Sequence, residues 1–307
     1  MNKVAIAGVA IAVSGAVGAQ WYANKRADDV IAQQVGQFSE QTGFDVSYEN
    51  VDYSLLSNTV TIEKMSFKSQ ETEQQLIDIE SMSIEGYSAD KVSPFTELVV
   101  KGMSLSSELA NAPEASVLPS SLVSAKYDLV SSLSFDESNG DSQIKLAASA
   151  QNLLDFAVNF DMTNSQEAMN LQLEIDKLHK QGEMDLEAEL QMQSKMLSAI
   201  QALQPKSFSF SLNNGGEFKS LVDELLQKNG LDHAQLQAML ASQLNAVPAS
   251  DVNKEAVKAF VAGLNSFEVS MEFPAQTSLM QLGMQLQPLA ADPQALEQFL
   301  KLKMVGK

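Results

Sequence analysis

Few side chains in this sequence could carry out chemistry. Its 307 residues include no cysteine and two histidines, His179 and His233. The lack of cysteine excludes disulfides, thiolate zinc sites and cysteine nucleophiles, and two histidines are too few for a multi-histidine metal site. His179 lies in a polar turn between two predicted strands, and His233 follows Asp232 at a predicted helix start. A general base needs a positioned partner and a pocket, so we interpret both as non-catalytic histidines.

Sequence motifs of catalysis and phosphate binding are also lacking. There is no Gly-x-Ser-x-Gly nucleophile elbow, no P-loop and no dinucleotide-binding Gly-x-Gly-x-x-Gly. The acidic segment 136–141 lacks the twelve-residue loop with a terminal Glu that binds calcium, so we interpret it as a hairpin turn. The net charge of −19 argues against nucleic acid, which is bound by clustered Lys and Arg. We therefore predict a protein that is not an enzyme and has no cofactor, no metal site and no nucleic-acid partner.

The most informative pattern is an eight-residue repeat that contains a Met-Ser pair. Segments 60–67 and 77–84 have apolar residues at positions one, three, six and eight; segment 98–105 repeats the pattern, and 128–135 is a weaker copy. The two apolar pairs differ in parity, so a flat strand would point them to opposite faces. A β-bulge between the pairs returns all four to one face and adds twist.

Strands bulged at the same place predict a curved sheet with one polar face and one apolar, concave face. An ordinary antiparallel meander with incidental bulges is the alternative. The residues predicted to line a ligand groove on the apolar face are Val60, Ile62, Met65, Phe67, Ile77, Ile79, Met82, Ile84, Val100, Met103 and Leu105.

Methionine is the one suggestive signal in the composition. The chain has 14 methionines, and Met65, Met82 and Met103 share one position of the repeat. A thioether side chain adapts to irregular partners, including acyl chains, but it also fills a core between uneven strands. Both interpretations remain open at this point.

The rest of the chain alternates between strand and helix patterns. A helix is predicted over 27–41, a flexible loop over 111–121, and a short helix up to residue 203. Further strands are predicted over 156–162, 169–175, 184–192, 208–212 and 267–273, with helices over 217–229, 231–244 and 250–264. Residues 279–286 fit a final strand or a short helix, and residues 294–305 are amphipathic.

The amino terminus predicts export. Lys3 is followed by 21 residues without charge, Val4 to Asn24, which as a helix would span about 31 Å, enough to cross a bilayer core. The residues predicted at the membrane interface are Trp21, Tyr22, Lys25 and Arg26. A small-residue cleavage site at 17–19 makes a removable secretory signal the alternative.

The amino-terminal layout, followed by the segment FDVSYENVDYSLLSNTVTIEKMSF, resembles the YdgA-like family of single-span periplasmic proteins of Gram-negative bacteria. It is also similar, more weakly, to the AsmA-like envelope proteins, whose repeated β units build a groove implicated in phospholipid movement. The resemblance covers residues 1–105. It implies a single-pass protein of the bacterial inner membrane with its C-terminal body in the periplasm, and it supplies no catalytic residues.

These observations predict an α+β fold with an N-terminal membrane helix, a curved antiparallel β-rich body with bulged repeats, and a helical subdomain near the C-terminus. The predicted division is 1–26 (anchor or signal), 27–215 (β-rich body), 216–266 (helical subdomain) and 267–307 (returning strands). The predicted function is non-catalytic binding of phospholipid or another amphiphile along the apolar sheet face. The alternative is a structural or interaction protein of the envelope that holds a protein partner.

Overall fold

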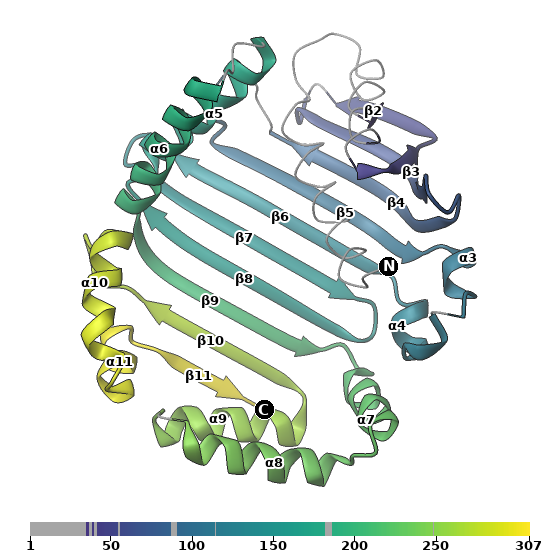
Figure 1. Ribbon diagram of the computed structural model, residues 1–307, viewed down its shortest axis with the longest axis vertical. Helices are drawn as coiled ribbons and strands as arrows, with labels where there is room; N and C mark the ends of the chain where they lie inside the picture. Colours follow the sequence, from purple (N-terminus) through teal and green to yellow (C-terminus); the bar gives the residue numbers. More distant parts are fainter. Residues whose placement is uncertain are drawn as a thin grey trace. The chain divides into compact units, whose positions relative to one another are not determined.

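The computed structural model describes residues 35–307, apart from 37–38, 40–41, 55, 87–90, 114, 182–185 and 248. The chain divides into two compact units (Figure 1). Unit 1 runs to residue 135 and includes residues 168–196, and unit 2 comprises residues 136–167 and 197–307.

Unit 1 is built on an antiparallel sheet in the order β1-β3-β4-β5-β6, with β2 also paired to β3. Its elements are β1 (Phe44–Ser47), β2 (Asn50–Ser54), β3 (Thr59–Ser69), β4 (Gln75–Glu85), β5 (Phe95–Leu105), α3 (Ser107–Ala110), η1 (Ala115–Val117), α4 (Ser120–Ser124) and β6 (Tyr127–Asp136). Helix α5 (Gln166–Gln181) belongs largely to this unit, and helix α6 (Leu186–Ala202) crosses the boundary between the units.

The strands of unit 1 change phase at aligned positions. Lys64 in β3 and Gly102 in β5 both have positive φ angles, 52° and 64°. The register of β3 on β4 is the same before and after this point, with Glu63 opposite Ser81 and Met65 opposite Ile79. Because neighbouring strands change phase together, the apolar residues on both sides of the irregularity stay on one face of the sheet.

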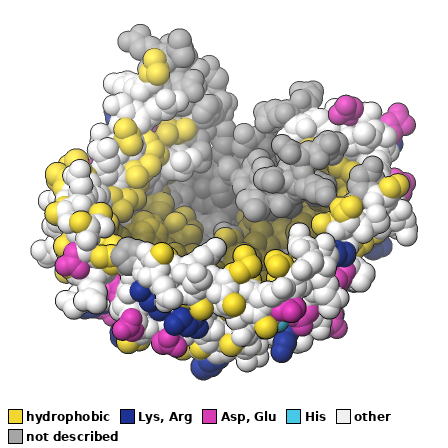
Figure 2. All heavy atoms as spheres, turned by 60° about the horizontal axis from the view of Figure 1, so that its bottom comes forward, with side chains coloured by type: hydrophobic (Ala, Val, Ile, Leu, Met, Phe, Trp, Pro, Cys, Tyr) yellow, Lys and Arg dark blue, Asp and Glu magenta, His cyan; other side chains and the backbone are white. Residues whose placement is uncertain are grey.

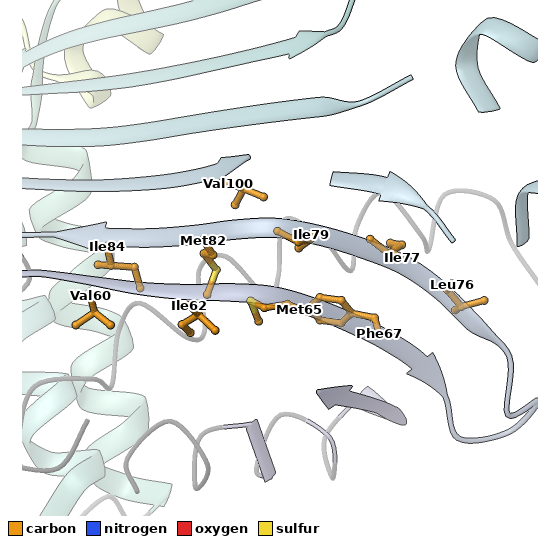
Figure 3. Packing of buried hydrophobic residues seen from close by; sticks show 10 residues of the cluster. All are labelled: Val60, Ile62, Met65, Phe67, Leu76, Ile77, Ile79, Met82, Ile84 and Val100. Atoms are coloured by element: carbon orange, nitrogen blue, oxygen red, sulfur yellow. The ribbon is translucent and has the colours of Figure 1, made fainter. Parts of the chain in front are cut away.

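That face is the core of unit 1. Ten residues form one buried cluster on it: Val60, Ile62, Met65, Phe67, Leu76, Ile77, Ile79, Met82, Ile84 and Val100 (Figure 3). Met65 and Met82 are each 1% exposed, so these methionines are packed among apolar neighbours. Burying each side chain of this kind contributes about 1.5–3 kcal/mol to folding.

Unit 2 contributes the strands β7-β8-β9-β10-β11, in that order, to the 11-stranded antiparallel sheet. Its strands are β7 (Asp141–Ala150), β8 (Leu154–Thr163), β9 (Gln204–Asn214), β10 (Ser266–Glu272) and β11 (Lys303–Gly306). Its helices are α7 (Phe218–Lys228), α8 (His233–Ala246), α9 (Asp251–Gly263), α10 (Leu279–Leu289) and α11 (Pro293–Phe299). Side chains cap the first turns of four of these helices: Asp232 for α8, Ser250 for α9, Ser278 for α10 and Asp292 for α11.

The predicted fold class requires correction. The structure is a mixed, sheet-rich fold, and within its described residues no helix has both the length and the apolar character needed to cross a bilayer. The span predicted over 4–23, the interface residues Trp21, Tyr22, Lys25 and Arg26, and most of the helix predicted over 27–41 lie outside the described residues.

Two predicted strands are helices. The segment 169–175 lies in α5, and 186–192 of the segment 184–192 lies in α6. In α5 the inward residues Leu171, Ile175 and Leu178 are four and three positions apart, which is helical spacing. Both segments are rich in Leu, Met, Gln and Glu, which favour helices, and poor in the β-branched residues that favour strands.

The segment predicted as a flexible loop also has regular structure. Within 111–121, residues Ala115–Val117 form η1, and α4 begins at Ser120. Ala115 is 5% exposed and Ser116 donates a hydrogen bond from its hydroxyl to the carbonyl of Pro113. Pro119 is the N-cap residue directly before the first turn of α4.

Candidate functional site

The sheet of unit 2 has one face that is apolar along three successive rows of cross-strand neighbours. Residues directly opposite each other on antiparallel strands point to the same face. The first row is Ile144, Phe160, Phe208 and Met271; the second is Leu146, Val158, Phe210, Val269 and Met304; the third is Ala148, Phe156, Leu212 and Phe267. We call these residues the apolar face.

The apolar face differs from the core of unit 1 in its exposure. None of its residues is fully buried: twelve are half-buried, and Ile144 is 41% exposed. The clustered core residues of unit 1 are at most 6% exposed. Soluble proteins rarely leave an apolar surface of this extent open unless it has a binding role.

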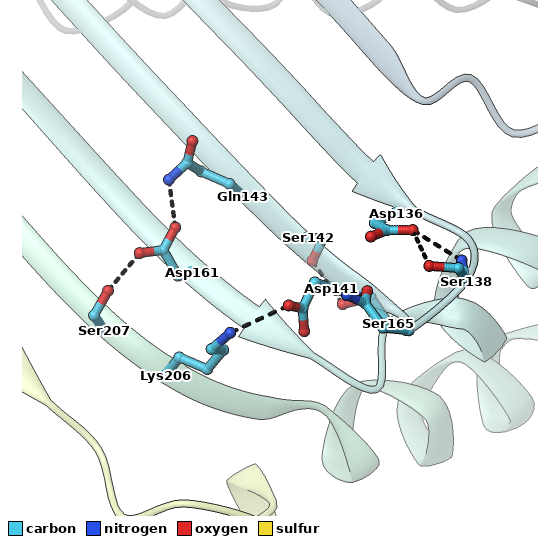
Figure 4. A network of polar contacts seen from close by, with 10 residues as sticks. Asp136, Ser138, Asp141, Ser142, Gln143, Asp161, Ser165, Lys206 and Ser207 are labelled. Carbon is cyan, nitrogen blue, oxygen red and sulfur yellow. Dashed lines mark hydrogen bonds and ion pairs between the residues drawn. The ribbon is translucent and has the colours of Figure 1, made fainter.

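The opposite face of the same sheet is polar (Figure 4). Asp161 on β8 accepts hydrogen bonds from the Gln143 amide on β7 and from the Ser207 hydroxyl on β9. Asn159 donates a hydrogen bond of 3.1 Å to the Ser209 hydroxyl. The polar side chains that alternate with the apolar face thus form hydrogen bonds with one another across the strands. The apolar face of the same strands is the surface whose partial exposure needs an explanation.

The helices of unit 2 border its sheet. Figure 1 shows α7, α10 and α11 near the ends of the strands, and α8 and α9 along the edge of the sheet beside β11. At one end, α9 packs so closely on β11 that a Cβ on Gly306 would lie 1.8 Å from the Ala256 carbonyl oxygen. The rings of Phe260 on α9 and Phe267 have their centroids 5.2 Å apart, so α9 closes the third row of the apolar face.

The other end of the apolar face is bounded by the chain that follows β10. Phe273 meets Phe160 of the first row edge-on, with ring centroids 6.3 Å apart. The amide of Phe273 donates to the Lys206 carbonyl, and the amide of Leu279 donates to the Leu203 carbonyl at the start of α10. Between these two ends lies the second row, which runs across all five strands.

Charged groups of unit 2 lie away from the three rows. Figure 2 shows broad hydrophobic areas on the visible face and separate groups of acidic and basic side chains. Glu272 is bound to Lys301, with 2.6 Å between its Oε2 and the Nζ atom. The hydrogen bond and positive charge of Lys301 hold the pKa of the Glu272 carboxyl below its ordinary value. Glu272 alternates with Met271 in β10 and so points to the polar face.

The groove residues predicted from the repeat lie in unit 1. Nine of them are in its buried cluster: Val60, Ile62, Met65, Phe67, Ile77, Ile79, Met82, Ile84 and Val100. Met103 and Leu105 are half-buried. The structure thus brings the predicted set together on one face, and within the described residues this set is packed as a core while the apolar face of unit 2 is open.

Among the described side chains, neither His233 nor the acidic turn has an arrangement typical of catalysis or metal binding. His179 lies in α5, and the His233 Nδ1 is 3.5 Å from the Asp223 Oδ1. Asp136 accepts hydrogen bonds from the amide and hydroxyl of Ser138, which lower the pKa of its carboxyl, as in a turn. Among the described residues, no three His, Asp or Glu side chains are grouped to hold a metal ion.

The sequence patterns predict three of the five strands of the apolar face, β8, β9 and β10, but neither β7, β11 nor the face itself. Phe156, Val158 and Phe160 have the spacing of a half-buried strand, as do Phe208 and Phe210. Their cross-strand pairing joins segments separated by two helices, and alternation alone does not reveal which strands pair. The available signal was the strict apolar–polar alternation in four strands without charge on the apolar side.

Comparison with known proteins places the chain in a family. Residues 147–306 match the model of a family described as "Uncharacterized protein". The chain belongs to this family. The matched range contains β8 to β11 in full, and with them most of the apolar face. No curated protein matches the chain. The resemblance to YdgA-like and AsmA-like proteins is independent of this match and stays a prediction.

Proposed function

We propose that this protein binds a lipid or another amphiphile along the apolar face of unit 2, without catalysis. The observation that carries the proposal is three complete apolar rows that remain partly exposed in a chain with a net charge of −19. An acidic protein gains solubility from its charge, so a large uncharged surface needs a separate reason, and ligand binding supplies one.

The dimensions and chemistry of the apolar face suit an acyl chain. Five strands spaced about 4.8 Å apart span about 19 Å from first to last, and the acyl region of one leaflet is about 15 Å thick, half of a bilayer core. An extended acyl chain can therefore lie along the second row, over Leu146, Val158, Phe210, Val269 and Met304. Burial of each methylene there contributes about 0.8 kcal/mol.

Aromatic and thioether side chains give this surface breadth and adaptability. Phe156, Phe160, Phe208, Phe210 and Phe267 supply flat apolar area with few rotatable bonds. Met271 on β10 and Met304 on β11 can change rotamer to follow a flexible ligand. A surface of this kind selects for apolar chains in general, whereas a narrow polar pocket would select for one small molecule.

Titration of a fluorescent fatty acid into the full chain tests this proposal. The substitution Phe210→Asn places an amide in the middle of the second row, and we expect it to weaken probe binding about tenfold or more because a polar group is then desolvated. The matched control is Ser209→Asn, the preceding residue of the same strand, which points to the polar face.

The outcomes separate the proposed function from its alternative. Probe binding that Phe210→Asn abolishes and Ser209→Asn retains supports an amphiphile site. If neither the probe nor a phospholipid binds the folded chain, the proposal is wrong. Specific crosslinking of one protein partner through the apolar face would then favour a role in holding another protein.

A further inference from the structure

Helix α10 has an unusual outer surface. Successive residues of an α-helix are 100° apart, so Met280 and Met284 share one face, and Leu282 lies opposite them. Leu282 is 5% exposed, whereas Met280 and Met284 are 55% and 60% exposed. The helix therefore packs inward through leucine and presents methionine outward, where surface helices ordinarily carry polar or charged residues.

The chain around these methionines has no charge. From Phe273 to Ala291 the sequence contains no Asp, Glu, Lys or Arg, although 19% of the whole chain is charged. The other exposed residues of α10 are Gln281, Gly283, Gln285, Gln287 and Pro288, all of which are uncharged. An acidic protein with a net charge of −19 can approach a lipid surface through this segment with little repulsion or desolvation of charge.

The uncharged segment is continuous with the apolar face. Phe273, its first residue, contacts Phe160 of the first row, and Thr277 just before α10 is 7% exposed. Helix α9 closes the third row at Phe267, six residues before Phe273 and so about 20 Å away along the strand. The end of the apolar face beside α10 is thus flanked by the exposed side chains of Met280 and Met284.

We propose that the outward face of α10 docks on an electrically neutral, zwitterionic phospholipid surface, from which the amphiphile passes to the apolar face. This inference rests on the proposed function for the identity of the ligand, but the docking itself has its own readout. Met280 and Met284 enter the boundary between headgroups and acyl chains, where an amphipathic helix lies in the plane of the interface. The docking is non-covalent and requires no charged contact.

The absence of cysteine allows a local test in the full chain. Met284→Cys carries a single environment-sensitive NBD label on the outward face of α10, and Met280→Cys gives a second, independent position. The matched control is Met239→Cys on α8, a methionine of similar exposure (50%) on the helix that contacts α9. Each labelled protein is mixed with phosphatidylcholine vesicles and, separately, with phosphatidylglycerol vesicles.

We expect the label at position 284 or 280 to shift to the blue and to brighten about twofold or more with phosphatidylcholine vesicles, as for a helix face at the acyl boundary. The response should not depend on salt, should be smaller with anionic vesicles, and should be absent at position 239. No response at 280 and 284, or an equal response at 239, overturns the docking proposal.

A separate measurement distinguishes failure of docking from failure of the proposed function. The variant M280Q/M284Q should bind the fluorescent fatty acid in vesicle-free solution with unchanged affinity, because neither side chain belongs to the apolar face. If the fatty-acid probe binds but the NBD labels do not respond to vesicles, only the docking proposal is wrong. If the NBD labels respond to vesicles but the fatty-acid probe does not bind, the proposed amphiphile site is wrong and the docking proposal stands.

Discussion

At the residue scale, a few backbone positions hold the strands of unit 1 in register. Lys64 and Gly102 have φ angles of 52° and 64°, in the left-handed region that glycine adopts at least cost. The amide of Gly102 donates a 2.7 Å hydrogen bond to Asp128 Oδ1, and Glu80 between these strands is paired with Lys126. The phase change is therefore built from specific contacts at one level of the sheet.

Substitution of Gly102 by alanine should destabilise the protein. A non-glycine residue in the left-handed region costs about 1–2 kcal/mol, and the new Cβ would lie 2.4 Å from the Glu80 side chain, which must move. Urea unfolding measures the loss. The control is Gly283→Ala in α10, which has open space around it and should be neutral or stabilising by up to about 1 kcal/mol. Equal effects at both positions would contradict this explanation.

The pair of Glu272 and Lys301 predicts a pH effect with a definite sign. Lys301 lowers the pKa of the Glu272 carboxyl in the folded state, so the pair stabilises the fold at pH values above the ordinary glutamate pKa. That contribution is lost as the pH falls through the lowered value. In an NMR titration, Lys301→Gln should raise the pKa of Glu272 towards 4.5, its ordinary value. An unchanged pKa would show that Lys301 does not control this carboxyl.

At the element scale, helix α9 depends on a glycine in the strand beneath it. Alanine at Gly306 would place its Cβ 1.8 Å from the Ala256 carbonyl oxygen and 2.8 Å from the Phe260 amide nitrogen, both in the backbone of α9. We expect Gly306→Ala to destabilise the protein by about 1–3 kcal/mol, as overpacking does. In this variant, hydrogen exchange of the α9 amides should be faster than in the unsubstituted protein, whereas exchange in α7 should change less. Unchanged protection of α9 would contradict this packing.

Elements with one clear period could be predicted from the sequence. The predicted strands 156–162, 208–212 and 267–273 lie in or largely overlap β8, β9 and β10, and the three predicted helices after residue 216 correspond to α7, α8 and α9. Segments 169–175 and 184–192 fit both periods, because residues such as Leu171 and Ile175 suit a strand alternation and a helix stripe alike. In such segments propensity decides, and Leu, Gln, Glu and Met favour the helix.

At the scale of the whole molecule, the strands of the two units differ in how far their apolar side chains are exposed, and this exposure could not be predicted from periodicity. The Met-Ser repeat and the strands of unit 2 have similar hydrophobic patterns, yet Ile62 is 1% exposed and Ile144 is 41% exposed. Which apolar face is covered depends on where loops and helices pack in three dimensions. The repeat pattern therefore predicts a groove in unit 1, where the structure has a packed core, whereas the partly exposed apolar face lies in unit 2.

Native mass spectrometry of the full chain extracted in mild detergent tests the central claim most directly. We expect the protein to retain an amphiphile as a discrete mass increment, and the Phe210→Asn variant to lose that increment while Ser209→Asn keeps it. A bare protein mass after reconstitution with phospholipid, or an increment that persists in Phe210→Asn, would contradict ligand binding on the apolar face of unit 2.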